Sequence, residues 1–376
     1  MTLARQSGVT LAGILHPDRN SFGVVRLAMA VAVLVSHSYF FVSGTSTTEP
    51  LHDITGHSLG EHAVQVFFFL SGILVMQSFI KSGSLVDFGT ARALRIFPGL
   101  SVCVLLTALV IGPIVSNADA WTYFSSSALP SYIAKTLLLV TGSAPLPGVF
   151  TDAPASGLVN MSLWTLKYEA LCYVMLGLAC ASGMMTGRHE GVSTTALAIL
   201  VFGIFLNEPK SIEAYSAADN IRYFALYFGM GVLACQLRQR LAIHGTGVLV
   251  FFFMFVVMLG TCWSELTCAL FLGYASLYVA TIDFGWIGRS LQGSDLSFGV
   301  YIYAAPIQQA LVQTFPGLRP LELAVAALVL TLGAANLSWG WIERTALARR
   351  TVVVTAFKGA LRAAVESGAP RFRAST

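Results

Sequence analysis

One stretch of the sequence limits what this chain can fold into: the apolar run from Ser21 to Gly44, SFGVVRLAMAVAVLVSHSYFFVSG. About 20 apolar residues at roughly 1.5 Å each cross the hydrocarbon core of a bilayer, so the run predicts a membrane helix. Arg26 and His37 lie within it, and eleven helical positions return to within about 20° of the same azimuth, so both side chains share a face. Ionisable groups inside a membrane are costly unless they face protein or a water-filled cavity, which predicts a functional use. The alternative is that Arg26 extends to the lipid headgroups and His37 makes a structural hydrogen bond.

The composition of the whole chain is typical of a polytopic membrane protein. Of its 376 residues, 56% are hydrophobic and only 11% are charged, which excludes an ordinary soluble domain. The net charge of +4 gives no indication of a nucleic-acid partner. The six cysteines show no metal-ligand spacing, and His52 and His57 in a short loop match no standard pattern, so no metal site is predicted.

Ten apolar segments predict an all-α fold with about ten transmembrane helices in the lipid bilayer. They cover residues 22–43, 62–80, 98–116, 161–184, 194–207, 221–237, 246–260, 264–282, 297–315 and 321–343. When these segments cross in turn, most of the 22 Lys and Arg residues fall on the side that holds both termini, which predicts cytoplasmic termini. We therefore divide the chain into a cytoplasmic segment (1–20), a membrane domain (21–345) and a basic cytoplasmic tail (346–376).

Two arginines precede the third segment. Arg92 and Arg95 lie three residues apart in ARALRIFP, and Pro98 is predicted to open the membrane helix. Positions i and i+3 share a helix face, so the two guanidiniums form a candidate phosphate clamp on the cytoplasmic side. The alternative is that they only follow the positive-inside rule. In the second segment, the pair Ser71-Gly72 predicts a close helix approach or a bend.

The fourth segment carries the next ionisable group inside a predicted span, Glu169. Helix rise places Glu169 about 10 Å below the outer end of its segment and His37 about 22 Å above the inner end of the first. In a core of about 30 Å these depths are similar, so a His–carboxylate pair in the outer half of the membrane is predicted. The same segment begins at the outer interface with Asn160 and Trp164.

Together these features resemble the acyltransferase-3 family of bacterial integral-membrane O-acyltransferases, over about residues 20–345. The resemblance rests on five stretches in order: Arg26 to His37, VFFFLSGILV, RALRIFPGL, NMSLWTLKYEALCY and LSFGVYIYAAPIQQAL. It implies a ten-span enzyme of the bacterial inner (cytoplasmic) membrane, in the stand-alone form without an added hydrolase-like domain. Such an enzyme moves an acyl group, usually acetyl, from cytoplasmic acyl-CoA to a hydroxyl of a carbohydrate such as an exopolysaccharide or lipopolysaccharide. It implies no bound cofactor, since acetyl-CoA or another acyl-CoA acts as co-substrate.

The resemblance also assigns roles to residues. His37 matches the family's essential histidine, Arg26, Arg92 and Arg95 match its conserved arginines, and Glu169 matches the carboxylate of its W-x-L-x-x-E motif. We expect His37 to remove the hydroxyl proton as general base and Glu169 to orient its ring, with an acyl-histidine intermediate as an open alternative. Arg92 and Arg95 would bind CoA phosphates, and Arg26 would line the path of the thioester arm.

Three further residues are expected to bind the acceptor. Asn160, Trp164 and Tyr168 lie near the outer interface, where a glycan could stack on aromatic rings and form hydrogen bonds. One departure from the family concerns Ala304 and Ala305, which stand where some members have a histidine. Any role of that histidine is absent here.

Two other classes of protein fit part of the same pattern. A buried His, Glu and Arg also suit the proton relay of a proton-coupled transporter of a glycan or small solute. A glycan-binding component that has kept the fold without the activity is the third reading. Turnover of an acyl-CoA thioester separates the enzyme from both.

Overall fold

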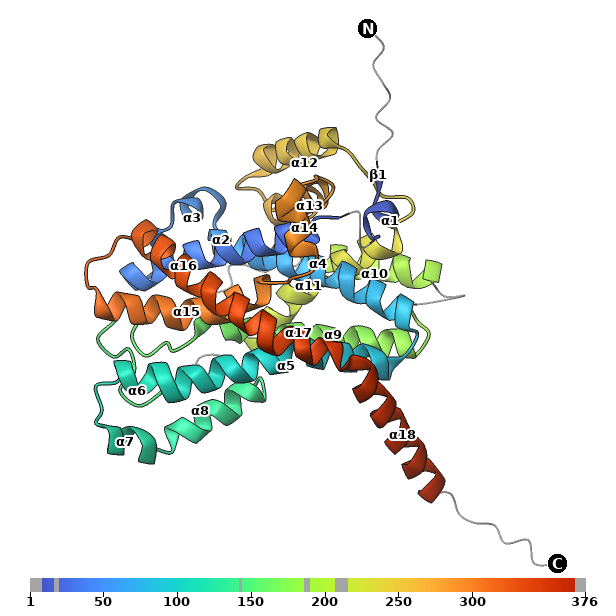
Figure 1. The fold of residues 1–376 in the computed structure, drawn as a ribbon. Helices are drawn as coiled ribbons and strands as arrows, with labels where there is room; N and C mark the ends of the chain where they lie inside the picture. Colours follow the sequence, from blue (N-terminus) through green and yellow to red (C-terminus); the bar gives the residue numbers. More distant parts are fainter. Residues whose placement is uncertain (1–8, 17–19, 142–143, 186–189, 207–215, 369–376) are drawn as a thin grey trace, which may run out of the picture.

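The computed structural model describes residues 9–16, 20–141, 144–185, 190–206 and 216–368, and in these residues the chain is almost wholly helical (Figure 1). The described residues form one small sheet, in which β1 (Val9–Thr10) pairs antiparallel with β2 (Ala242–Ile243). The predicted all-α fold is therefore confirmed. Parts of the predicted terminal segments, residues 1–8, 17–19 and 369–376, lie outside the described residues.

Helical structure lies at each of the ten predicted segments. In chain order it comprises α2 (Phe22–Ser43), α4 (Leu59–Ser82), α5 (Leu85–Leu106) continued by η3 (Thr107–Ile111) and α6 (Gly112–Val115), η4 (Met161–Thr165) continued by α9 (Leu166–Ala181), α10 (Glu190–Leu206), α11 (Ala217–Gln236), α12 (Gly245–Met258), α13 (Ser264–Ala280), α15 (Ser297–Thr314), and α16 (Pro320–Ser338) continued by η7 (Trp339–Glu343). Shorter or flanking helices are α1 (Leu11–Ile14), η2 (Ser46–Thr48), α3 (Pro50–Thr55), α7 (Ala120–Ser125), α8 (Ala128–Leu137), α14 (Gly285–Gln292), α17 (Arg344–Ala348) and α18 (Arg350–Gly368).

Several of these helices can cross a membrane. Within the described residues, five stretches are long and apolar enough: Phe22–Ser43, Leu59–Ser82, Leu85–Val115, Met161–Ala181 and Pro320–Ala360. A sixth crossing results if α13 and α14, which meet at 101°, form one broken span. Multiple membrane-spanning helices are thus confirmed, whereas the count of ten spans and the cytoplasmic termini stay predictions.

The third span begins earlier than predicted. α5 starts at Leu85, where the Ser84 side chain accepts a hydrogen bond from the backbone N–H of Asp87. The helix then continues through Pro98, so the prediction that this proline opens the span is wrong. Proline removes one backbone hydrogen bond, but membrane helices tolerate that loss when neighbouring helices enclose the site. Arg92 and Arg95 therefore lie inside a long helix and not in a loop.

α4 and α11 pack closely against each other in the core. A Cβ atom at Gly72 would lie 2.1 Å from the carbonyl oxygen of Phe228, and one at Gly231 would lie 2.0 Å from that of Phe69. Both distances are far below van der Waals contact, so the two backbones can meet only because both positions are glycine. The close approach predicted at Ser71-Gly72 is confirmed.

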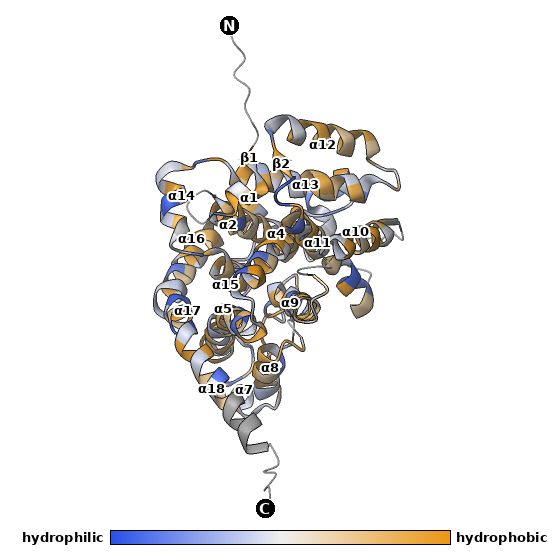
Figure 2. Ribbon diagram, turned by 90° about the vertical axis from the view of Figure 1, so that its right-hand side faces the viewer, coloured by the Kyte–Doolittle hydropathy of each residue, from blue (hydrophilic) through white to orange (hydrophobic). Residues whose placement is uncertain are grey.

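Apolar side chains also cover much of the outside of the helix bundle. Figure 2 shows hydrophobic residues on the outward faces of α10 and α12. On α12 the side chains of Leu249 and Phe253 are 67% and 68% exposed, and the helix packs mainly against α13. Such a surface suits contact with lipid chains, which are as apolar as leucine. The ionisable side chains that the sequence predicts inside the spans line a cavity within the bundle or are buried in it.

Candidate active site

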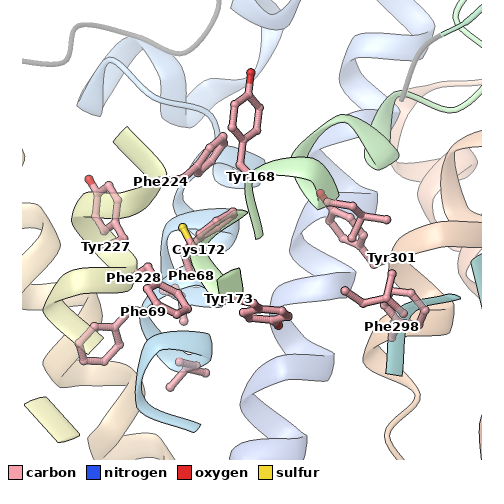
Figure 3. Close-up of a cluster of buried hydrophobic side chains, with 14 of the residues drawn as sticks. Phe68, Phe69, Tyr168, Cys172, Tyr173, Phe224, Tyr227, Phe228, Phe298 and Tyr301 are labelled. Carbon is pink, nitrogen blue, oxygen red and sulfur yellow. The ribbon is translucent and has the colours of Figure 1, made fainter. Parts of the chain in front are cut away.

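A cavity with an empty volume of about 760 Å³ lies between α2, α4, α5, α9 and α15. These five helices and η4 supply its polar lining: Arg26, Ser71, Arg92, Arg95, Thr165, Glu169, Tyr173, Ser297 and Tyr301. Phenylalanine side chains form much of the remaining wall, and Figure 3 shows Phe298 and Tyr301 on one side of Tyr173 and the Phe68 and Phe228 rings on the other. The cavity thus brings together four residues that the sequence singled out: Arg26, Arg92, Arg95 and Glu169.

Glu169 is held by two hydroxyl groups. Tyr173, one helical turn later in α9, donates a hydrogen bond to Oε1 of Glu169, and Ser71 Oγ of α4 donates to the same oxygen at 3.1 Å. No ion pair of Glu169 occurs among the described residues. The carboxylate therefore faces the cavity with hydroxyl partners and without a directly bound cation.

Arg92 lies over the ring of the same tyrosine. Its guanidinium carbon is 5.7 Å from the Tyr173 ring centre, a cation–π distance. In the described structure no carboxylate pairs with Arg92, and its buried Nε has no hydrogen-bond partner. Of the three arginines in the cavity, Arg92 thus keeps the positive charge that is least neutralised.

Arg26 and Arg95 share one carboxylate. Asp295, which lies between α14 and α15, forms an ion pair with Nη1 of Arg26 and another with Nη2 of Arg95, the latter at 2.6 Å. Nη1 of Arg95 also lies 3.7 Å from Oε2 of the buried Glu343. Burial raises the pKa of Asp295, but the two guanidiniums outweigh burial and hold this pKa below its usual range. The carboxylate is therefore ionised and fixes both arginines.

His37 lies further along α2 than this cavity. Eleven residues separate it from Arg26, which is about 16 Å of helix. Its ring packs edge-on against Phe41 with centres 5.9 Å apart, and its buried Nδ1 has no hydrogen-bond partner among the described residues. The flanking serines are engaged, since Ser36 donates to Glu49 and Ser38 accepts from Gln308. No hydrogen bond in the described structure joins His37 to Glu169, so their pairing stays a prediction.

The three residues expected to bind the acceptor are packed into the protein. The Asn160 amide is fully buried and donates to the carbonyl oxygen of Ile302 at 2.8 Å, which ties the start of η4 to α15. Trp164 and Tyr168 contact each other and the Phe224 ring, with centres 5.2–5.8 Å apart. In Figure 3 the Tyr168 hydroxyl points away from Tyr173 and the cavity side. Their role in acceptor binding stays a prediction.

Sequence reasoning missed the carboxylates that pair with the arginines. Asp295 directly precedes the LSFGVYIY stretch, and Glu343 lies at the end of the last apolar segment, yet neither was identified as part of a site. A signal was present, because arginines inside a membrane require counter-charges. Which acidic residue supplies them depends on helix packing. From the sequence, Ser71 was identified only as a packing residue, and Tyr173 was not identified.

A second buried polar cluster lies outside the candidate active-site cavity. His57 forms ion pairs with Glu265 at 2.9 Å and Glu61 at 3.5 Å, and Tyr227 donates to the same Glu265. Burial lowers the pKa of His57, but the hydrogen bonds with Glu265 and Glu61 raise it overall to about 10. This cluster joins the loop before α4 to α13. No group of three or more His, Cys, Asp or Glu side chains in the described residues is arranged to hold a metal ion.

Comparisons with known proteins match this chain to one protein family and to two relatives. Residues 19–339 match a family described as "Acyltransferase domain". The chain is 31% identical over 339 residues to an "O-acetyl transferase" of Shigella phage Sf6, covering 88% of this chain and 96% of the relative. It is 26% identical over 365 residues to "Nodulation protein 10" of Rhizobium leguminosarum bv. viciae, covering 89% and 95%. No solved structure matches significantly.

Proposed function

Because this chain belongs to the acyltransferase family that covers residues 19–339, we propose that it moves an acetyl group from acyl-CoA to a hydroxyl of an envelope or exported polysaccharide. The name of the Sf6 relative supports O-acetyl transfer. The donor and the carbohydrate acceptor come from the family resemblance of the sequence motifs. The observation that carries the proposal is that three arginines and the hydroxyl-bound carboxylate of Glu169 line one cavity inside the helix bundle.

The proposed chemistry is a single acyl transfer. The acceptor hydroxyl oxygen attacks the thioester carbonyl carbon while neutral His37 takes the hydroxyl proton. The tetrahedral intermediate then collapses, the carbon–sulfur bond breaks, and the thiolate of CoA takes up the proton from His37. The free Nδ1 of His37 supports this role, since no described side chain competes for it. Orientation of His37 by Glu169 is part of the same proposal.

The proposed setting is the bacterial inner membrane, with ten spans and both termini in the cytoplasm. The excess of basic residues on one side supports this orientation. A reporter fused after Arg350 should then be cytoplasmic, and one inserted at Ser126 should be external. The opposite location of either reporter would overturn the orientation and with it the side from which the donor enters.

The decisive experiment measures thioester turnover. Purified protein in lipid nanodiscs should release CoA thiol from acetyl-CoA when bacterial envelope polysaccharide is added, and mass spectrometry should find new acetyl groups on that polysaccharide. His37→Ala should abolish both signals, and the matched variant His52→Ala should keep them. Solute movement without loss of thioester would instead identify a transporter and refute the proposal.

A further inference from the structure

Two more cavities continue from the candidate active site toward one end of the bundle. The next cavity is lined by Arg26, Asp295 and Ser294 and has an empty volume of about 770 Å³. It shares Arg26 and Leu74 with the active-site cavity. The outermost cavity, of about 970 Å³, shares Asn20, Phe22 and Leu74 with this second cavity. The three cavities therefore follow one another along α2 and α4, and we call the outermost one the mouth.

The mouth is polar and positively charged. Its lining includes Lys81 at the end of α4 and Arg350 at the start of α18, together with Asn20, Gln77, Ser78 and Ser82. In the described residues neither cation has a carboxylate partner; Arg350 only donates to the backbone oxygen of Asp87 at 3.4 Å. The side chain of Asp87 itself pairs with Lys358. Two cations and four polar side chains thus line the mouth, and no carboxylate is among its described lining residues.

Two of the three arginines in the active-site cavity, Arg26 and Arg95, differ from these two cations. Arg26 and Arg95 are already neutralised by Asp295 and Glu343, as described above. A dianionic phosphate gains most where cations have no competing carboxylate. Lys81 and Arg350 at the mouth are therefore better placed to bind such a phosphate than Arg26 and Arg95.

The distance along α2 agrees with the length of the proposed donor. From Phe22 at the mouth to His37 there are fifteen residues of α2, about 22 Å, and Arg26 lies about 6 Å from Phe22 along the helix. In CoA, the sulfur is separated from the diphosphate by about 13–15 bonds, an extended reach of roughly 16–19 Å by ordinary bond lengths. The ribose 3′-phosphate lies a few ångströms beyond the diphosphate. A thioester near His37 therefore places the diphosphate near Arg26 and the 3′-phosphate at the mouth.

We propose that Lys81 and Arg350 bind the ribose 3′-phosphate of the acyl-CoA donor. This assignment rests on the proposed function and adds a recognition site that the arginines of the active-site cavity do not supply. It predicts discrimination between CoA and dephospho-CoA, which differ only in that phosphate. An anionic lipid headgroup has the same chemistry and is the other source of phosphate that the test must separate.

The test compares the affinities for CoA and for dephospho-CoA in purified full-length protein, measured by calorimetry in detergent without added lipid. Wild type should bind CoA about tenfold or more tightly than dephospho-CoA, as expected for a charge-assisted phosphate contact. Lys81→Ala and Arg350→Ala should each reduce this ratio about threefold or more, and the double variant should bring it close to one. Affinity for dephospho-CoA should stay unchanged. Arg349→Ala removes the same charge from the neighbouring exposed position and should keep the wild-type ratio.

The outcomes separate this site from the proposed function. Equal binding of CoA and dephospho-CoA by wild type, or an unchanged ratio in the folded double variant, overturns the 3′-phosphate site and leaves acyl transfer intact. Failure of wild type to bind either compound overturns both. Phosphatidylglycerol added to wild type should not displace CoA; competitive displacement would assign the mouth to lipid and overturn the proposal. If an alanine variant aggregates, Lys81→Gln and Arg350→Gln test the same loss of charge with less change in side-chain volume.

Discussion

Neutralising Asp295 should damage both the stability and the activity of this enzyme. In Asp295→Asn, Arg26 loses the carboxylate with which it pairs, and Arg95 keeps only Glu343 at 3.7 Å. Removing one partner of a buried ion pair costs about 3–5 kcal/mol. The side chains of Arg26 and Asp295 are each 23% exposed, so solvent screening reduces the expected cost to about 2 kcal/mol. For a chain of this size that corresponds to roughly 2–5 °C of melting temperature.

The effect on acyl transfer should be larger than the effect on stability. Two guanidiniums that are no longer fixed by a common oxygen repel each other and change the lining of the cavity, and misplacement of about 1 Å can cost up to a hundredfold in rate. We expect transfer to fall at least tenfold in Asp295→Asn. The assay combines thermal unfolding in nanodiscs with acetyl transfer at equal amounts of folded protein.

A second substitution tests whether Asp295 stabilises the fold by pairing with Arg26. Adding Arg26→Gln to Asp295→Asn removes the unpaired charge, so the double variant should melt at a higher temperature than Asp295→Asn alone. Asp283→Asn is the matched control, because Asp283 is exposed and has no cationic partner among the described residues. If Asp295→Asn melts and reacts like Asp283→Asn, the carboxylate of Asp295 does not fix the two arginines.

Three further predictions test other parts of the molecule. His37→Ala should nearly abolish acetyl transfer, and Glu169→Gln should lower it. If the two residues act as one unit, the double variant should be little worse than His37→Ala. If the two defects instead multiply in an acetyl-transfer assay, Glu169 acts independently of His37. The raised pKa of His57, about 10, means that its charge stabilises the fold fully below about pH 6.5 and that this contribution disappears as the pH rises through about 10. Melting temperatures measured from pH 6 to 10 should therefore fall more steeply in wild type than in His57→Gln, and parallel curves would contradict the ion pairs with Glu265 and Glu61. Gly72→Ala should prevent the contact between α4 and α11 and yield little folded protein on size-exclusion chromatography, whereas Gly89→Ala, where a Cβ atom meets nothing within 4 Å, should yield wild-type amounts.

The sequence by itself determined the class of the protein and the position of its helices. Length and hydropathy are local properties, so each of the ten predicted segments coincides with helical structure even though the number of crossings stays a prediction. Helix periodicity also placed Arg92 and Arg95 on one face, and both line the same cavity. The motif resemblance identified the family that the comparisons then showed.

Only the tertiary structure decided which of these side chains meet. Depth along a helix can be counted from the sequence, but the direction in which a side chain points depends on how the helices pack, and two glycine contacts between α4 and α11 set that packing. Glu169 therefore meets Ser71 and Tyr173, while Arg26 meets Asp295, which is 269 positions away in the chain. Asn160 was predicted to lie at the outer interface, and in the structure its buried amide donates to the carbonyl oxygen of Ile302. Local patterns carry no information on partners so far apart, because such partners are chosen by the packing of the whole bundle.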